Sequence, residues 1–260
     1  MILTRTRLAV AELTALLTTD FDVPTLLHTL VGHARGCFEA CSAVLILLDD
    51  RRRGGQADIR IVAESTSDGY RADPALHTSG PGPTSAHTGA VTMITDLHTA
   101  DDTRWSHYRA SALAAGMGGV RAFPVTALAV PLGALVIHTT GPWGATRPNE
   151  LGQILADLSA VALSIADPHG RRVTTSDTIE AVLADTTTVS VAVGILAEYL
   201  DLSIDGARDR LVRLARAHNT TPTTHAKAIT GAHNRHPGDP AASGLLHPPP
   251  DPSAPPNING

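Results

Sequence analysis

The most restrictive feature of this sequence is a regular apolar spacing in its C-terminal third. From Ile179 to Leu200, apolar residues recur at alternating intervals of three and four, with one polar interruption at Thr186. This spacing, sustained over about three heptads, is typical of a helix that buries one stripe against a partner. We expect the N-terminal part of the stripe to pair with a second subunit and the C-terminal part to pack on the chain's own helices. The alternative is that the whole stripe packs within one chain. The predicted dimer seam consists of Ile179, Val182, Val189, Val193 and Leu196.

A second helical pattern follows the seam and carries four arginines within nine residues. Ser203 is a favourable N-cap, and Asp205 in the first turn suits the positive end of the helix dipole. On a helical wheel one face of this segment is apolar and the other is basic. The apolar face consists of Ile204, Ala207, Leu211, Leu214 and Ala215, and the basic face consists of Arg208, Arg210, Arg213 and Arg216.

A third, shorter helix is predicted directly after the arginine helix. Asn219 is a suitable left-handed terminator, while Thr221 and Pro222 are typical of an N-cap and a first helical position. This helix should stop at Gly231 and point Ala226 inward. The three segments together predict a small helical bundle with one basic face.

The sequence from Arg5 to about Asp167 changes its periodicity in an ordered way. Helical spacing is followed by β-branched or leucine-rich runs, then by a helix, two more such runs and a closing helix. This order predicts a mixed α+β domain built on one antiparallel sheet and flanked by helices. The predicted strands are 42–49, 58–65, 90–97, 119–127 and 128–140, and the predicted helices are 1–20, 24–39, 102–116 and 150–166.

Composition excludes several other classes of protein. The chain has 260 residues, 43% of them hydrophobic, which is ample for a core, and its longest strongly apolar run, 127–137, is too short to span a membrane. We therefore expect a cytoplasmic protein. Two cysteines and thirteen scattered histidines, with no HExxH or HxH pair, predict no metal site. The last residues, 232–260, are rich in Pro and Gly, which predicts a disordered tail.

The residues from 80 onward carry a family resemblance. "GPGPTSAHTGAVTMITDLHTADDTRWSHYRASALAAGMGGVRAFPV", followed by "PLGALVIHTT", resembles a GAF sensory domain of the actinobacterial type. The resemblance implies a ligand pocket between the sheet and its covering loops and helices, here the segment 80–97, with Trp105 as a packing anchor. Members bind cyclic nucleotides, tetrapyrroles or haem, and this chain lacks the residue pattern of the cyclic-nucleotide binders. The small-molecule ligand and any cofactor stay unknown.

The segment 178–231 resembles a second family, the ANTAR domain, which is an RNA-binding three-helix module. The matching residues are "AVGILAE", then Ser203 and Ala207, followed by Leu211, Ala215 and Asn219. The resemblance implies dimerisation through a coiled coil and binding of paired RNA hairpin loops that prevents a terminator from forming. The RNA-binding residues that it implies are Ala192, Gly194, Arg208, Arg213, Arg216 and Asn219.

Three positions depart from that family's pattern, because Thr186, Val193 and Val212 are neutral where a basic residue is usual. Each missing cation removes part of the affinity for phosphates. Residues 171–231 carry seven Lys or Arg and seven Asp or Glu, so the net positive charge is confined to the segment after residue 205. The alternative is therefore a dimeric sensor whose bundle binds a protein partner instead of RNA.

The sequence as a whole predicts a signal-responsive transcription antitermination regulator that is not an enzyme. The glycine-rich segment at 80–89 lacks the lysine of a phosphate-binding loop, and no serine has an evident base and orienting acid. The predicted parts are an N-terminal helix at 1–20, a GAF-like domain at 21–167, a linker at 168–177, an ANTAR-like domain at 178–231 and the tail.

Overall fold

The protein divides into two compact units, Met1–Leu183 and Ala184–Gly260. The structure is a computed structural model, and it describes residues 2–19, 21–49, 58–67, 70, 73–99, 103–144, 147, 149–165, 175–235 and 244–249. The division falls inside one continuous helix, α6 (Thr175–Leu200), so both units contain part of it. Most of the predicted linker lies outside the described residues, and its last three residues belong to α6.

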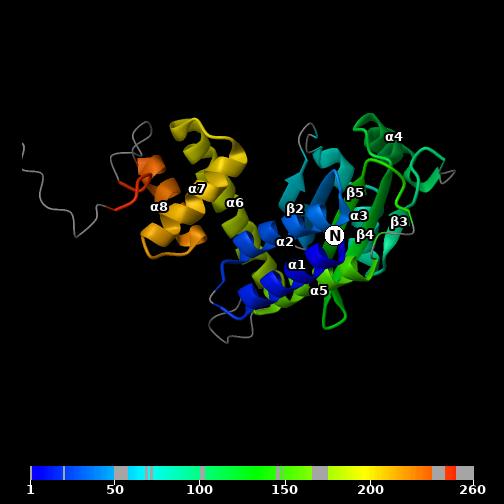
Figure 1. Ribbon diagram of the computed structural model, residues 1–260, viewed down its shortest axis with the longest axis horizontal. Helices are drawn as coiled ribbons and strands as arrows, with labels where there is room; N and C mark the ends of the chain where they lie inside the picture. Colours follow the sequence, from blue (N-terminus) through cyan, green and yellow to red (C-terminus); the bar gives the residue numbers. More distant parts are fainter. Residues whose placement is uncertain are drawn as a thin grey trace, which may run out of the picture. The chain divides into compact units, whose positions relative to one another are not determined.

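The first unit is built on a five-stranded antiparallel sheet in the order β2-β1-β5-β4-β3 (Figure 1). This confirms the predicted α+β class with one antiparallel sheet. The central strands are apolar on both faces because helices or loops cover both. The strands are β1 (Ser42–Asp49), β2 (Asp58–Thr66), β3 (Thr92–Ile94), β4 (Gly119–Ala127) and β5 (Val130–Thr139).

Helices cover the two faces of the sheet with separate cores. Alternation along β1 sends Leu45 and Leu47 into one core and Val44 and Ile46 into the other. The first core contains α1 (Ile2–Leu17), α2 (Val23–Phe38), α5 (Asn149–Ile165) and the start of α6. The second contains α3 (Pro81–Thr88), α4 (Ser106–Ala114) and the short 3-10 helices Pro74–His77 and Thr103–Trp105.

The turn between β4 and β5 occupies two residues that the sequence analysis assigned to the start of a strand. The predicted strands 119–127 and 128–140 meet near the observed break, because β4 ends at Ala127 and β5 begins at Val130. The two intervening residues, Leu128 and Ala129, have φ values of 49° and 65°. Such left-handed pairs suit a two-residue hairpin, but Asn and Gly usually occupy them, so Leu and Ala carry no typical turn signal.

The second unit contains the predicted three-helix bundle, formed by the end of α6, α7 (Ile204–Ala217) and α8 (Pro222–Arg235). The Ser203 hydroxyl accepts a hydrogen bond from the Gly206 amide at 3.1 Å, as an N-cap should. The Thr221 hydroxyl accepts one from the Thr224 amide at 3.2 Å, and Asn219 is left-handed with a φ of 53°. The predicted helix boundaries therefore follow from local capping chemistry.

Two details of the bundle differ from the prediction. Ile204 is 58% exposed although the wheel placed it on the apolar face, because it lies in the first turn, where the helix begins. Helix α8 continues past Gly231 to Arg235 and so includes the first residues of the predicted tail. A described segment of that tail, 244–249, places Leu246 in the bundle core; the rest of the tail lies outside the described residues.

Helix α6 is long and apolar enough to cross a membrane when judged by length and composition alone. An 18-residue window within Asp177–Leu200 has a mean hydropathy of 1.6. The apolar segment that meets the length criterion for a membrane span is therefore α6, not the shorter run at 127–137. The stripe of α6 that gives this composition is buried in the protein's own two cores, as in the core helix of a folded protein.

Two helical glycines allow a matched test of the first core. A Cβ at Gly152 of α5 would collide with the ring of the fully buried Phe123, whereas a Cβ at Gly32 of α2 would meet no atom within 4 Å. We expect Gly152→Ala to lower the free energy of unfolding by about 1–3 kcal/mol, because a packed core does not admit extra volume. Gly32→Ala should raise it by up to about 1 kcal/mol, because alanine favours a helix. Urea unfolding measures both, and equal changes in the two variants would contradict this packing.

Candidate functional site

The arginine helix α7 presents its cations at different depths. Arg213 and Arg216 are exposed, while Arg208 and Arg210 are half-buried at the two edges of the apolar face. Among the described residues, neither Arg213 nor Arg216 forms an ion pair with Asp201, Asp205 or Asp209. These two arginines are therefore available to an anion.

The half-buried arginines are partly engaged by the protein itself. Burial lowers the pKa of Arg208, an effect that nearby Asp205 opposes. The Nε atoms of Arg208 and Arg210 are buried and make no hydrogen bond. A guanidinium nitrogen of Arg210 donates to the backbone carbonyl of Leu246 at 3.3 Å. Arg208 is thus a weaker candidate for binding phosphate than Arg213 or Arg216.

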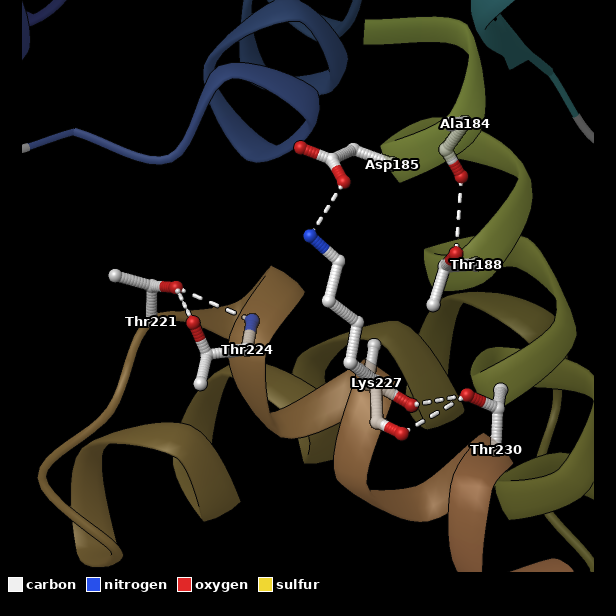
Figure 2. A network of polar contacts seen from close by, with 8 residues as sticks. Ala184, Asp185, Thr188, Thr221, Thr224, Lys227 and Thr230 are labelled. Carbon is white, nitrogen blue, oxygen red and sulfur yellow. Dashed lines mark hydrogen bonds and ion pairs between the residues drawn. The ribbon is translucent and has the colours of Figure 1, made fainter. Parts of the chain in front are cut away.

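Lys227 on α8 is neutralised by an ion pair within the second unit. Its Nζ lies 2.8 Å from a carboxylate oxygen of Asp185 on α6, as Figure 2 shows. The neighbouring contacts are helix-internal: the Thr188 hydroxyl donates to the Ala184 carbonyl, and the Thr230 hydroxyl donates to the Ala226 and Lys227 carbonyls. Lys227 therefore adds little to a positive surface, although it lies in the segment after residue 205 that carries the net positive charge.

The other predicted RNA-binding residues divide between surface and core. Gly194 and Asn219 are exposed, and a Cβ at Gly194 would meet no atom within 4 Å. Ala192 is fully buried in the bundle core, so its side chain supports packing and cannot contact RNA. The sequence placed all of these residues on one binding surface, and the structure leaves Gly194, Arg213, Arg216 and Asn219 exposed.

The predicted dimer seam is buried inside the single chain. Ile179 and Val182 belong to the first core of the first unit, and Val189, Val193 and Leu196 belong to the core of the bundle. The packing of the seam within one chain is thus the alternative that the structure shows. In the single chain these five side chains are at most 7% exposed, so they present little surface to a second subunit.

The described tail segment is held on the bundle by three consecutive backbone carbonyls. The Nε2 atom of His225 is 2.9 Å from the Leu245 carbonyl, and the Nε2 atom of His218 is 2.9 Å from the His247 carbonyl. Arg210 binds the carbonyl between them, and the two imidazole rings stack with centroids 4.8 Å apart. The sequence analysis predicted disorder here from the Pro and Gly content of the whole tail. That content does not show that Leu245 and Leu246 pack against the bundle core.

A cluster of buried polar side chains lies in the second core of the first unit. His138 on β5 is fully buried, and its Nε2 atom is 2.9 Å from the Tyr108 hydroxyl of α4. The ring of His77 lies 6.0 Å from the ring of His138, centroid to centroid. The Nδ1 atoms of both histidines are buried without a hydrogen-bond partner. The sequence analysis treated these histidines only as scattered residues that form no metal site. The position of His138 inside the apolar run "GALVIHTT" was the available signal that it is buried.

Burial sets the protonation of this cluster. Burial lowers the pKa of His77 to about 4. Burial, together with the nearby His77, lowers the pKa of His138 to about 3. Burial also raises the pKa of Tyr108 and of Cys41, whose thiol donates to the His138 carbonyl at 3.3 Å. All four groups are therefore neutral near pH 7. Among the described residues, no group of three or more potential ligands could hold a metal ion.

The face on which the sequence placed a ligand pocket is closely packed where the structure describes it. A Cβ at Gly80 would lie 2.6 Å from the Tyr108 ring, and one at Gly82 would lie 2.8 Å from a methyl group of Val136. Trp105 and Leu97 are buried in the same core. Trp105 thus packs as predicted, and the backbone at Gly80 and Gly82 approaches the core too closely to admit a side chain.

Comparison with solved structures identifies the fold of the first unit; no family model and no curated protein matches the chain. The phycoerythrobilin-bound GAF domain from a cyanobacterial phytochrome has a TM-score of 0.50 at 15% identity, covering 61% of this chain and 94% of that one. The GAF domain from an Acinetobacter phosphoenolpyruvate-protein phosphotransferase has a TM-score of 0.46 at 13% identity, covering 66% and 97%.

A third similar structure is the chromophore-binding domain of an unusual bacteriophytochrome from R. palustris. Its TM-score is 0.47 at 10% identity over 63% of this chain, and the chain spans only 61% of that domain's length. At such identities the likeness shows the fold alone. The fold is that of a GAF domain, as the sequence resemblance predicted.

The buried histidines predict a loss of stability in acid. Each is neutral in the folded protein, whereas an exposed histidine of the unfolded chain has its ordinary pKa of 6.5. As pH falls from about 6.5 toward 4, the unfolded state binds more protons, so the free energy of unfolding falls by up to about 1.4 kcal/mol per pH unit for each group. Urea unfolding between pH 7 and 4.5 should show this slope. It should be shallower in His138→Gln and unchanged in His107→Gln, whose imidazole is exposed; equal slopes in both variants would contradict the assignment.

Proposed function

We propose that the protein is a non-enzymatic, signal-responsive regulator in which the GAF-fold unit senses a small molecule and the C-terminal bundle binds RNA hairpin loops, acting in transcription antitermination. The observation that carries this proposal is the exposed pair Arg213 and Arg216 on the outer face of a three-helix bundle. The bundle has the helix boundaries expected for an ANTAR-like module: the Ser203 cap and the left-handed Asn219.

The sensory half of the proposal is supported by the fold. One of the similar structures is a GAF domain that binds phycoerythrobilin. Nothing in the described part of this chain specifies a bilin, so the proposed ligand is a small molecule without further identity. The protein is proposed to act in the cytoplasm.

One observation favours a protein partner as the second candidate function. The positive surface of the bundle is reduced in three ways: Arg208 is half-buried, Lys227 is paired with Asp185, and position 212 holds a neutral valine. Two freely exposed arginines provide only a small phosphate-binding surface. A bundle of this kind can instead bind another protein through its exposed helix faces. RNA-binding measurements distinguish the two functions.

The RNA proposal predicts a specific response to salt. Replacing Arg213 or Arg216 with Gln should weaken binding of paired hexaloop hairpins several-fold and lower the salt slope of the affinity by roughly 0.7–0.9 for each lost phosphate contact. Arg60→Gln, which removes an exposed arginine from β2 of the first unit, is the matched control and should change neither quantity. Fluorescence anisotropy at several salt concentrations measures both. If hairpins and an equal-length duplex bind alike, or if the arginine variants bind as the parent does, the protein-partner function replaces this one.

The neutral positions allow a gain-of-function test. Arg208, Val212 and Arg216 are four residues apart, so a cation at 212 would lie on the same ridge of α7. Val212→Lys should strengthen hairpin binding because the half-buried valine stands at the edge of the exposed face. Val193→Lys should instead unfold the bundle, because Val193 is buried in its core and a lone buried ammonium is costly. Circular dichroism identifies the unfolded variant, and unchanged RNA affinity in a folded Val212→Lys protein would count against an RNA surface on α7.

The proposed homodimer requires a surface other than the buried seam. Ile154, Val161 and Ile165 are exposed on α5 at intervals of seven and four, so they form one straight apolar stripe. Such a stripe can pair with its own copy about a two-fold axis. Val161→Glu should convert a micromolar dimer to a monomer in light scattering, whereas Val191→Glu, at an equally exposed valine of α6, should not. A monomeric parent protein would refute the homodimer.

A further inference from the structure

A cavity of about 250 Å³ lies in the first unit beside the end of the β4–β5 hairpin. Its walls come from the hairpin, the C-terminal end of α5 and the first turns of α6. Leu132, Leu163 and Ile179 belong to the first core, so the cavity lies on the sheet face opposite the buried histidines. The lining residues are Ala127, Leu128, Val130, Leu132, Leu163, Ser164, Thr178 and Ile179.

The lining defines the chemistry of an occupant. None of the eight lining side chains is ionisable, and six are aliphatic. Transferring a charged group into such a site without a partner is costly, so the occupant is uncharged. The cavity is open to solvent on the side of the exposed Leu128, so only part of an occupant would be enclosed. Since a cavity of about 150 Å³ holds benzene, a volume of about 250 Å³ has room for a molecule of two fused rings.

The hydroxyl groups add one directional feature. The Ser164 hydroxyl donates its hydrogen to the Ala160 carbonyl at 2.8 Å, so its remaining capacity is as an acceptor. A ligand with one N–H or O–H group could donate to it. The second lining hydroxyl belongs to Thr178, on the α6 wall.

The hairpin at the mouth of the cavity is conformationally costly. Leu128 and Ala129 both adopt left-handed conformations, which non-glycine residues seldom do. The Leu128 side chain is also fully exposed, at 101%. Strained backbone of this kind is concentrated at binding sites and other functional positions, where the surrounding structure maintains it. An apolar side chain held in solvent next to an apolar cavity gains burial when a ligand enters.

We propose that this cavity binds an uncharged, apolar small molecule of about two fused rings that carries a single hydrogen-bond donor. Binding buries aliphatic surface of the hairpin, α5 and α6 together, and the donor pairs with the Ser164 hydroxyl. Because α6 continues from this wall into the bundle, the ligand contacts the helix that leads to the proposed effector. A regulatory effect of the ligand on the bundle rests on the proposed function, whereas binding of the ligand to the cavity does not.

Indole is a suitable probe, because it is uncharged, has two fused rings and has one N–H donor. Calorimetry on the full chain should show saturable 1:1 binding, and indole should raise the unfolding temperature. Indole-3-carboxylate, which adds a charge to the same rings, should bind at least about tenfold more weakly. Absence of saturable indole binding, or equal binding of the carboxylate, would overturn the proposal.

Two variants locate the bound indole. Ser164→Leu fills the cavity from α5 and should weaken indole binding by at least about tenfold, and Thr178→Leu, which fills it from α6, should do the same. The matched control is Ser190→Leu, since Ser190 is an exposed α6 serine whose hydroxyl also donates to a carbonyl four residues earlier. Calorimetric unfolding verifies that each variant is folded. Indole that binds both filled variants as tightly as the parent lies elsewhere, which overturns the assignment.

Parallel RNA measurements separate this inference from the proposed function. Hairpin binding is measured on the parent protein without indole. If indole binds as described while hairpins do not bind, the cavity stands and the RNA function fails. If hairpins bind and indole does not, the RNA function stands and the cavity proposal fails.

Discussion

The structure depends on one buried stripe along α6. The N-terminal part of the stripe, at Ile179 and Val182, completes the core beneath the sheet, and the later part, at Val189 and Leu196, completes the core of the bundle. A helix with this apolar spacing cannot stay exposed in water, since each such side chain contributes about 1.5–3 kcal/mol when it is buried. Because one helix satisfies this requirement twice, neither core is complete without α6. The stripe is thus occupied before any partner arrives.

Burial also decides how much of the basic helix can act on a ligand. The helical wheel assigns all four arginines of α7 to one face. Arg208 and Arg210 lie at the two edges of that face, next to the buried apolar side, and are half-buried. There the guanidinium groups lose contact with water, and Arg210 satisfies a carbonyl of the tail segment. The exposed positive surface is therefore smaller than the count of cations suggests. On α7 the exposed positive surface consists of Arg213 and Arg216.

The GAF-fold unit uses the two faces of its sheet differently. One face is filled by a polar cluster of His77, Tyr108 and His138, which burial keeps neutral. The other face contains the aliphatic cavity at the base of the β4–β5 hairpin. A neutral imidazole with an unsatisfied nitrogen costs stability, whereas an empty aliphatic cavity forgoes dispersion contacts. The two faces therefore differ in chemistry, with buried neutral polar groups on one and a mainly aliphatic cavity on the other.

The sequence by itself determined the elements whose cause is local. Ser203, Thr221 and Asn219 end or begin helices through their own hydrogen bonds or backbone preference, and the β-branched or leucine-rich runs placed β1 and β4 at their observed limits. The tertiary structure alone decided which partner each apolar surface meets. The periodicity of α6 shows that its apolar stripe must be buried. The same periodicity results whether a second subunit or the chain's own helices bury that stripe. The burial of His138 and the pairing of Lys227 with Asp185 likewise depend on contacts between residues distant in sequence, which no local pattern encodes.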